Sequence, residues 1–84
     1  MKIELFFTNY CPFCQIVLAE IKFLNLAEDI VMHDTMSDPI AAARHLSTTG
    51  RKTVPCLYIE DEPLFESSDI VKWLKDNKSK IKGS

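Results

Sequence analysis

The stretch KIELFFTNYCPFC, residues 2–14, combines a run of β-forming residues with two cysteines that are separated by two residues. Apolar side chains alternate onto one face of the run and Phe6 adds one to the other face, which predicts a mostly buried strand over residues 2–8. The alternating residues are Ile3, Leu5 and Phe7. Pro12 suits the first position of a helix, because its φ is fixed and it has no N–H group to satisfy. The stretch therefore predicts a strand that leads into a helix, with Cys11 at the helix N-cap.

A second strand is predicted after this helix. Apolar residues recur at helical spacing over residues 13–24, and a short β-rich segment follows at residues 29–34. The recurring residues are Ile16, Val17, Ile21 and Leu24. Because a helix separates the two strands, we expect them to run parallel, joined by a right-handed crossover.

The middle of the chain repeats the same helix-start pattern. Asp38 and Pro39 precede a helical segment over residues 40–46, and Gly50 is typical of the residue that ends such a helix. A third strand is then predicted over residues 53–59, which are rich in β-forming residues.

The last third of the chain predicts a hairpin and a final helix. An acidic turn over residues 60–63 reverses the chain, and residues 64–66 pair back as an antiparallel edge. Ser67 and Ser68 are candidate caps for the helix that follows. Its apolar face is expected to contain Ile70, Val71 and either Leu74 or Trp73.

These elements predict a three-layer α/β domain of order βαβαββα, with a mixed sheet of four strands between helices. The domain is expected to span residues 1–77. The lysine-rich segment 78–84 is expected to form a loosely held, flexible tail.

Composition narrows the classes of partner. The chain has 84 residues, 46% of them hydrophobic, which is enough for the core of one small domain. The chain has ten Lys and Arg residues and twelve Asp and Glu residues. The resulting net charge of −2 gives no general attraction to nucleic acid or anionic lipid. Three cysteines do not make a disulfide scaffold, and the N-terminal segment resembles neither a signal peptide nor a membrane span. We therefore expect a soluble, cytoplasmic and monomeric protein.

The two cysteines of the first stretch predict redox chemistry. At a helix N-terminus Cys11 faces free N–H groups, which favour its thiolate. A fall in its pKa from about 8.5 to about 6 requires about 3.4 kcal/mol, more than the helix dipole supplies. Direct hydrogen bonds from residues near Cys14, and a cation from Arg51 or Lys52, are expected to supply the rest. Cys14 lies one turn along the helix, at a spacing compatible with a disulfide.

A metal site is the alternative for these cysteines. It needs further ligands, and Cys56, His33 and His45 are the only soft candidates, without a second Cys-x-x-Cys or His-x-x-x-His pattern. We therefore expect no metal. His33 is predicted to be a strand residue near the surface, His45 to lie on the polar side of its helix without a special role, and Cys56 to be a buried strand residue.

Three motifs in order, CPFC after the first strand, TVP at the start of the third and SSD at the last helix, are similar to those of the glutaredoxins over essentially the whole chain. This resemblance implies a thioredoxin-like fold with Pro55 in the cis form. It also implies that glutathione is bound in an extended form, with its cysteinyl backbone paired to Val54 and its sulfur at Cys11.

The same resemblance implies a set of glutathione-binding residues. The γ-glutamyl group maps to the start of the last helix, the glycyl carboxylate to a basic residue before TVP, and Tyr10 to a wall of the groove. The full set is Tyr10, Arg51, Lys52, Thr53, Val54, Pro55, Ser67, Ser68 and Asp69.

The chain departs from the glutaredoxin pattern at three points, the third being Cys56 directly after Pro55. Thr8 stands where many members have Lys or Arg, which removes one route to a low thiol pKa. Glu66 and Ser67 stand where many members have a glycine pair, and they are closer to the ES of the glutathione-transferase N-terminal domain.

The resemblance implies a glutathione-dependent thiol–disulfide oxidoreductase. Cys11 is the expected nucleophile and Cys14 the resolving cysteine, with disulfide-containing or glutathionylated proteins as substrates. Two alternatives remain: a thioredoxin-like redoxin reduced by a flavoprotein reductase, and an iron–sulfur carrier that uses Cys11 and glutathione. Pro12 disfavours the carrier, since cluster-binding members tend to have a small residue there.

Overall fold

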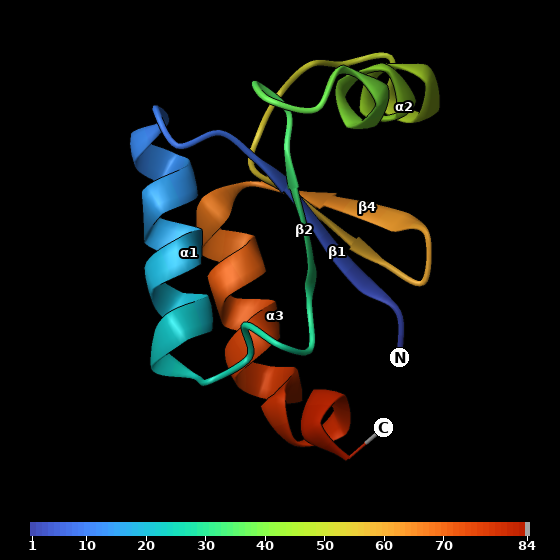
Figure 1. Cartoon of the computed structure of the whole chain (residues 1–84). Helices are drawn as coiled ribbons and strands as arrows, with labels where there is room; N and C mark the ends of the chain where they lie inside the picture. The colour runs from blue at the N-terminus through green and yellow to red at the C-terminus, as the bar shows by residue number, and fades with distance from the viewer. Residues whose placement is uncertain (84) are drawn as a thin grey trace.

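The computed structural model describes residues 1–83 of the chain, and it contains the predicted order of strands and helices (Figure 1). The elements are β1 (Ile3–Phe7), α1 (Pro12–Phe23), β2 (Val31–Asp34), α2 (Pro39–Thr49), β3 (Cys56–Ile59), β4 (Glu62–Phe65) and α3 (Ser67–Lys82). The four strands form one sheet in the order β2-β1-β3-β4. β1 runs parallel to β2 and antiparallel to β3, and β3 runs antiparallel to β4. The predicted mixed sheet is therefore confirmed.

β1 lies at the centre of the fold, and all five of its residues are buried. Ile3, Leu5 and Phe7 belong to the larger core, which the sheet forms with α1 and α3. Phe6 points to the opposite face, where it packs with Tyr58 and α2. Figure 1 shows α1 and α3 side by side, with α2 apart from them. The alternation in the sequence of β1 thus determines which side chains face each helical layer.

The predicted helix starts are confirmed for α1 and α2. Cys11 is the N-cap of α1 in extended geometry, and Pro12 is the first helical residue. The Asp38 carboxylate caps α2 by accepting hydrogen bonds of 3.1 Å from two backbone N–H groups of its first turn. Gly50 ends α2 with a φ of 72°, a left-handed conformation that glycine adopts without strain.

The hairpin and the start of α3 differ from the prediction. Glu60 and Asp61 alone form the turn, both with positive φ, and Pro63 lies in β4 opposite Tyr58. A proline is tolerated there because β4 is an edge strand. Ser67 and Ser68 are not N-caps of α3: they are its first two helical residues, and Glu66 is the N-cap.

The prediction of a loosely held tail is wrong for residues 78–82, which continue α3. Ile81 is buried in the larger core, and the Lys82 ammonium lies 2.8 Å from the Asp29 carboxylate. The lysine-rich sequence of this segment does not predict a packed helix end. One buried apolar residue, Ile81, is nevertheless enough to anchor it to the core. Ser84 lies outside the described residues. None of the helices within residues 1–83 is long and apolar enough to cross a membrane.

A buried charge on β1 stabilises the layer between the sheet and α2. The Glu4 carboxylate, 6% exposed, accepts a hydrogen bond of 2.8 Å from Arg44 of α2 and lies 2.9 Å from the His33 ring on β2. The hydrogen bond from Arg44, together with that from His33, lowers the pKa of Glu4 to about 2, although burial opposes the shift. Glu4 is therefore ionised in the folded protein and compensated by partners from two other elements.

We expect this carboxylate to make folding sensitive to acid. Its pKa in the folded protein is below the ordinary value of 4.5, so its contribution is complete above about pH 4.5 and is lost as the pH falls towards 2. That contribution amounts to about 3 kcal/mol. Urea denaturation at several pH values should show that Glu4→Gln is less stable than the wild type at neutral pH and nearly equal to it near pH ~2. The control Glu28→Gln, at an exposed position, should follow the wild type; a constant gap for Glu4→Gln at all pH values would contradict the assignment.

Candidate active site

The Cys11 sulfur lies half-buried at the N-terminus of α1, beside the segment that precedes β3. The Cys11 Sγ atom is 3.9 Å from the backbone oxygen of Val54. The peptide bond between Val54 and Pro55 is cis, as the glutaredoxin resemblance implied. Residues that are 43 positions apart in the chain are thus brought together at the end of the central strand.

Local hydrogen bonds favour the thiolate of Cys11. Its partial burial raises its pKa, but hydrogen bonds from the backbone N–H and the thiol of Cys14, and from the backbone N–H of Phe13, outweigh this effect and lower the pKa below 9.0. The predicted hydrogen bonds from residues near Cys14 therefore act on Cys11. The predicted cation from Arg51 or Lys52 is not among the causes of the shift.

The other two cysteines have the opposite character. Burial raises the pKa of Cys14 to about 11, and its sulfur accepts a hydrogen bond of 3.5 Å from the backbone N–H of Thr8. Burial likewise raises the pKa of Cys56 to about 11. Cys56 packs with Phe6 and Tyr58 as the buried strand residue that the sequence predicted. All three cysteines are free thiols, and only Cys11 is accessible.

A groove of about 450 Å³ runs along the Val54 segment towards the start of α3. It brings together five of the predicted glutathione-binding residues with two further residues, Phe13 and Glu66. The five are Thr53, Val54, Pro55, Ser67 and Ser68. The groove therefore connects the TVP segment with the N-terminus of α3, the two parts of the chain that the motifs predicted to form one site.

The remaining predicted residues lie outside this lining. Tyr10 is 84% exposed and does not form a wall of the groove. The Arg51 guanidinium stacks on the Phe65 ring, 4.2 Å from its centroid, and Lys52 lines a second hollow. Asp69 is exposed in the first turn of α3. Tyr10 lies in the turn before α1 and Arg51 directly follows the Gly50 end of α2, and both residues are exposed.

Glu66, which departs from the glutaredoxin pattern, lies in the lining of the groove. It is the N-cap of α3, with a φ of 73° and without a side-chain capping bond. A positive φ is uncommon outside glycine, so glycine is an alternative that relieves strain at this position. In the sequence, only the similarity of the Glu66–Ser67 pair to the ES of the glutathione-transferase N-terminal domain indicated that Glu66 belongs to the site.

The prediction that His45 lies on the polar side of its helix without a special role is wrong. His45 is 1% exposed, stacked on Phe6, and both ring nitrogens are engaged. Nε2 donates to the Thr53 carbonyl and Nδ1 accepts from the Tyr58 hydroxyl, each at 2.8 Å. Since a carbonyl only accepts, this contact assigns the proton to Nε2 in the neutral ring. His45 therefore ties α2 to the segment before the cis proline, and Thr53 is part of the groove.

No cluster of three or more potential metal-ligating side chains occurs among residues 1–83. Cys56, His33 and His45 each have other partners: the sheet core, Glu4, and the Thr53 and Tyr58 oxygens.

Comparison with solved structures identifies the fold. The thioredoxin-like protein BC3987 shares 27% sequence identity with a TM-score of 0.72, over 89% of this chain and 97% of that chain. An epsilon-class glutathione S-transferase from the housefly Musca domestica has 21% identity and a TM-score of 0.72, over 94% of this chain and 36% of that one. A diazinon-metabolizing glutathione S-transferase of the silkworm Bombyx mori has 20% identity and the same TM-score, over 100% of this chain and 40% of that one. This domain is therefore thioredoxin-like, and it spans well under half the length of these transferases.

The family model of the glutathione S-transferase N-terminal domain matches residues 5–81. The chain belongs to this family. No curated protein sequence matches it significantly. The match begins within β1 and ends within α3, and it includes every residue that lines the groove.

We expect the three thiols to differ sharply towards iodoacetamide. Cys11 should be alkylated selectively in the folded protein, with a half-maximal rate below pH 9.0, because its pKa is lowered. Cys14 and Cys56 should react only after unfolding, because both are buried with raised pKa values. Mass spectrometry of peptides gives the rate for each cysteine. Cys14→Ala should move the Cys11 titration to higher pH; early labelling of Cys14, or no such movement, would contradict this assignment.

The His45 contacts predict a large stability effect. His45→Phe keeps a ring on Phe6 but leaves the Thr53 carbonyl and the Tyr58 hydroxyl without their buried partner, so unfolding should become easier by about 2 kcal/mol. Urea denaturation of His45→Phe, Tyr58→Phe and the double variant measures the coupling. Tyr58→Phe should lower the free energy of unfolding only a little in a protein that already carries His45→Phe. Strict additivity would show that the two side chains do not act together.

Proposed function

We propose that this protein is a glutathione-dependent thiol–disulfide oxidoreductase. The Cys11 thiolate attacks one sulfur of a substrate disulfide, forming a mixed disulfide and releasing the other sulfur as a thiolate. Cys14 then loses its proton, attacks the Cys11 sulfur and releases the second substrate thiol. Two glutathione molecules reduce the resulting Cys11–Cys14 disulfide and leave as oxidised glutathione.

The asymmetry of the two thiols carries this proposal. Cys11 is accessible with a lowered pKa, whereas Cys14, three residues later on the same helix, is buried with its pKa raised to about 11. The Cys11 thiolate therefore attacks the substrate disulfide first. Cys14 stays protonated until a mixed disulfide has formed at Cys11, and it then attacks the Cys11 sulfur. Two cysteines with a purely structural role would not require this difference in accessibility and pKa.

Glutathione as the reductant is supported by the groove and by the family. The first turn of α3, with Ser67 and Ser68, offers N–H groups to the γ-glutamyl carboxylate, and Asp69 is close enough in sequence to take the amino group. Val54 offers a strand edge to the cysteinyl backbone beside Cys11. Lys52 is the candidate for the glycyl carboxylate, since Arg51 is stacked on Phe65. The proposed setting is the cytoplasm, with disulfide-containing or glutathionylated proteins as substrates.

A redoxin reduced by a flavoprotein reductase is the second candidate. The 27% identity to a thioredoxin-like protein, over 97% of that chain, favours it. The chemistry at Cys11 and Cys14 is the same in both, so the electron donor alone distinguishes them.

The decisive assay is reduction of a glutathionylated peptide coupled to glutathione and glutathione reductase. The wild type and Cys14→Ser should turn over, and Cys11→Ser should lose activity by at least about 100-fold, because no other thiol is accessible. Reduction of a protein disulfide should need both cysteines. The control Cys56→Ser should retain activity, since Cys56 lies within the sheet core.

Running the same assay with thioredoxin reductase and NADPH separates the two candidates. Turnover with glutathione supports the oxidoreductase proposed first. Turnover only with the flavoprotein reductase supports the redoxin, and loss of neither activity in Cys11→Ser contradicts both.

A further inference from the structure

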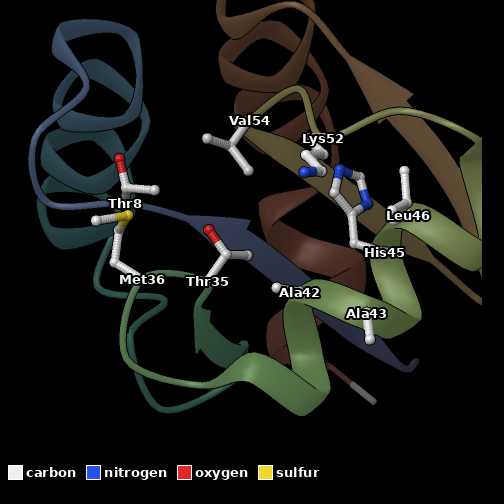
Figure 2. Close-up of a pocket in the computed structure, with 9 residues that line it drawn as sticks. All are labelled: Thr8, Thr35, Met36, Ala42, Ala43, His45, Leu46, Lys52 and Val54. Atoms are coloured by element: carbon white, nitrogen blue, oxygen red, sulfur yellow. The ribbon is translucent and has the colours of Figure 1, made fainter.

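The structure contains a second hollow, of about 360 Å³, and Figure 2 draws the side chains that line it. Val54 lines both this hollow and the groove, so the two meet at the residue whose backbone oxygen faces the Cys11 sulfur. The lining of the second hollow comes from Thr8, the loop after β2, α2 and the segment before β3. Cys11 therefore stands beside two hollows rather than one.

The surface of the second hollow is mostly apolar, and its polar groups are the Thr8 and Thr35 hydroxyls and the Lys52 ammonium. Met36, Ala42 and Leu46 contribute hydrocarbon or thioether atoms. The Thr35 hydroxyl donates to the Phe7 carbonyl at 3.3 Å, and both His45 nitrogens are engaged, so neither side chain offers a free donor to an occupant. The full set of lining side chains is drawn in Figure 2.

Lys52 is the one lysine, arginine or carboxylate residue that lines this hollow, and its ammonium group has no partner among residues 1–83. It forms neither an ion pair nor a side-chain hydrogen bond within residues 1–83, unlike Lys2, Lys72 and Lys82. An occupant suited to these walls combines an apolar group with an anionic or carbonyl end.

The direction of the bound substrate decides which group enters. With the γ-glutamyl end at the start of α3 and the cysteinyl backbone at Val54, the residue that follows the cysteine reaches Lys52 and the second hollow. In glutathione that residue is glycine, which has no side chain. A hollow of about 360 Å³ is within the range of whole small-molecule sites and exceeds what glycine fills.

We propose that the second hollow is a specificity pocket for a large apolar side chain on the residue that follows the reacting cysteine of a substrate. The inference rests on the proposed function, which supplies the direction of binding. It defines a substrate class: peptide and protein disulfides with a cysteine followed by leucine or a residue of similar size. Lys52 then faces the carboxylate or backbone carbonyl of that residue.

The test is a thiol-exchange equilibrium in the Cys14→Ser protein, which stops at the Cys11 mixed disulfide. Glutathione and γ-glutamyl-cysteinyl-leucine compete: the Cys11–glutathione bond breaks, a Cys11–peptide bond forms, and the proton of the incoming thiol passes to the released glutathione. Mass spectrometry of the intact protein gives the ratio of the two adducts. The exchange between the same thiols without protein corrects for their intrinsic difference. We expect about tenfold preference for the leucine peptide, with the alanine analogue between the two.

Two variants locate the preference. Ala42→Leu places a larger side chain in the pocket and should bring the ratio close to one, whereas Ala19→Leu, on the exposed side of α1, should keep the preference. Thermal unfolding followed by circular dichroism verifies that both variants fold. If Ala42→Leu does not fold, the graded series of glycine, alanine and leucine peptides on the unmodified pocket still decides.

The outcomes separate this inference from the function on which it rests. Equal adducts with all three peptides, or a preference that survives Ala42→Leu, overturn the specificity pocket while the oxidoreductase chemistry stands. Failure of Cys11 to form a mixed disulfide with any of the peptides overturns both.

Discussion

The burial of β1 on both of its faces is the constraint on which the rest of the structure depends. Its odd-numbered residues anchor α1 and α3, and its even-numbered residues face α2. Since both layers are fixed by one strand, the chain that leaves its end has a defined position, and it delivers Cys11 to the start of α1. Reactivity at Cys11 therefore depends on the larger core, in which Cys14 is packed among the apolar side chains that the structure describes.

The layer between the sheet and α2 contains buried polar side chains as well as apolar ones. Glu4 is held by Arg44 and His33, and His45 is held by Tyr58 and the Thr53 carbonyl. Such groups are costly to bury unless every one is paired, so they fix a single position of α2 against the sheet. Because His45 binds Thr53, the same contacts position the segment that ends in the cis proline.

The site combines chemistry from two parts of the chain that meet only in the fold. The first turn of α1 lowers the pKa of Cys11 through its own N–H groups, and the segment before β3 supplies the edge at which a substrate backbone can pair. Val54 divides the surrounding surface into a groove that reaches α3 and a hollow that reaches α2. In the proposed function, cysteine chemistry and substrate selection thus belong to different elements.

The sequence by itself determined the local features: the order of strands and helices, the N-cap position of Cys11, the Asp38 cap and the Gly50 end of α2. These depend on φ restrictions, capping and periodicity within a few residues. Only the tertiary structure decided the burial of His45, the pairing of Glu4 with Arg44, the anchoring of the lysine-rich end by Ile81 and the second hollow beside Cys11. Each of these joins residues from different elements, and no local pattern records which distant partner will satisfy a buried polar group or leave a space unfilled.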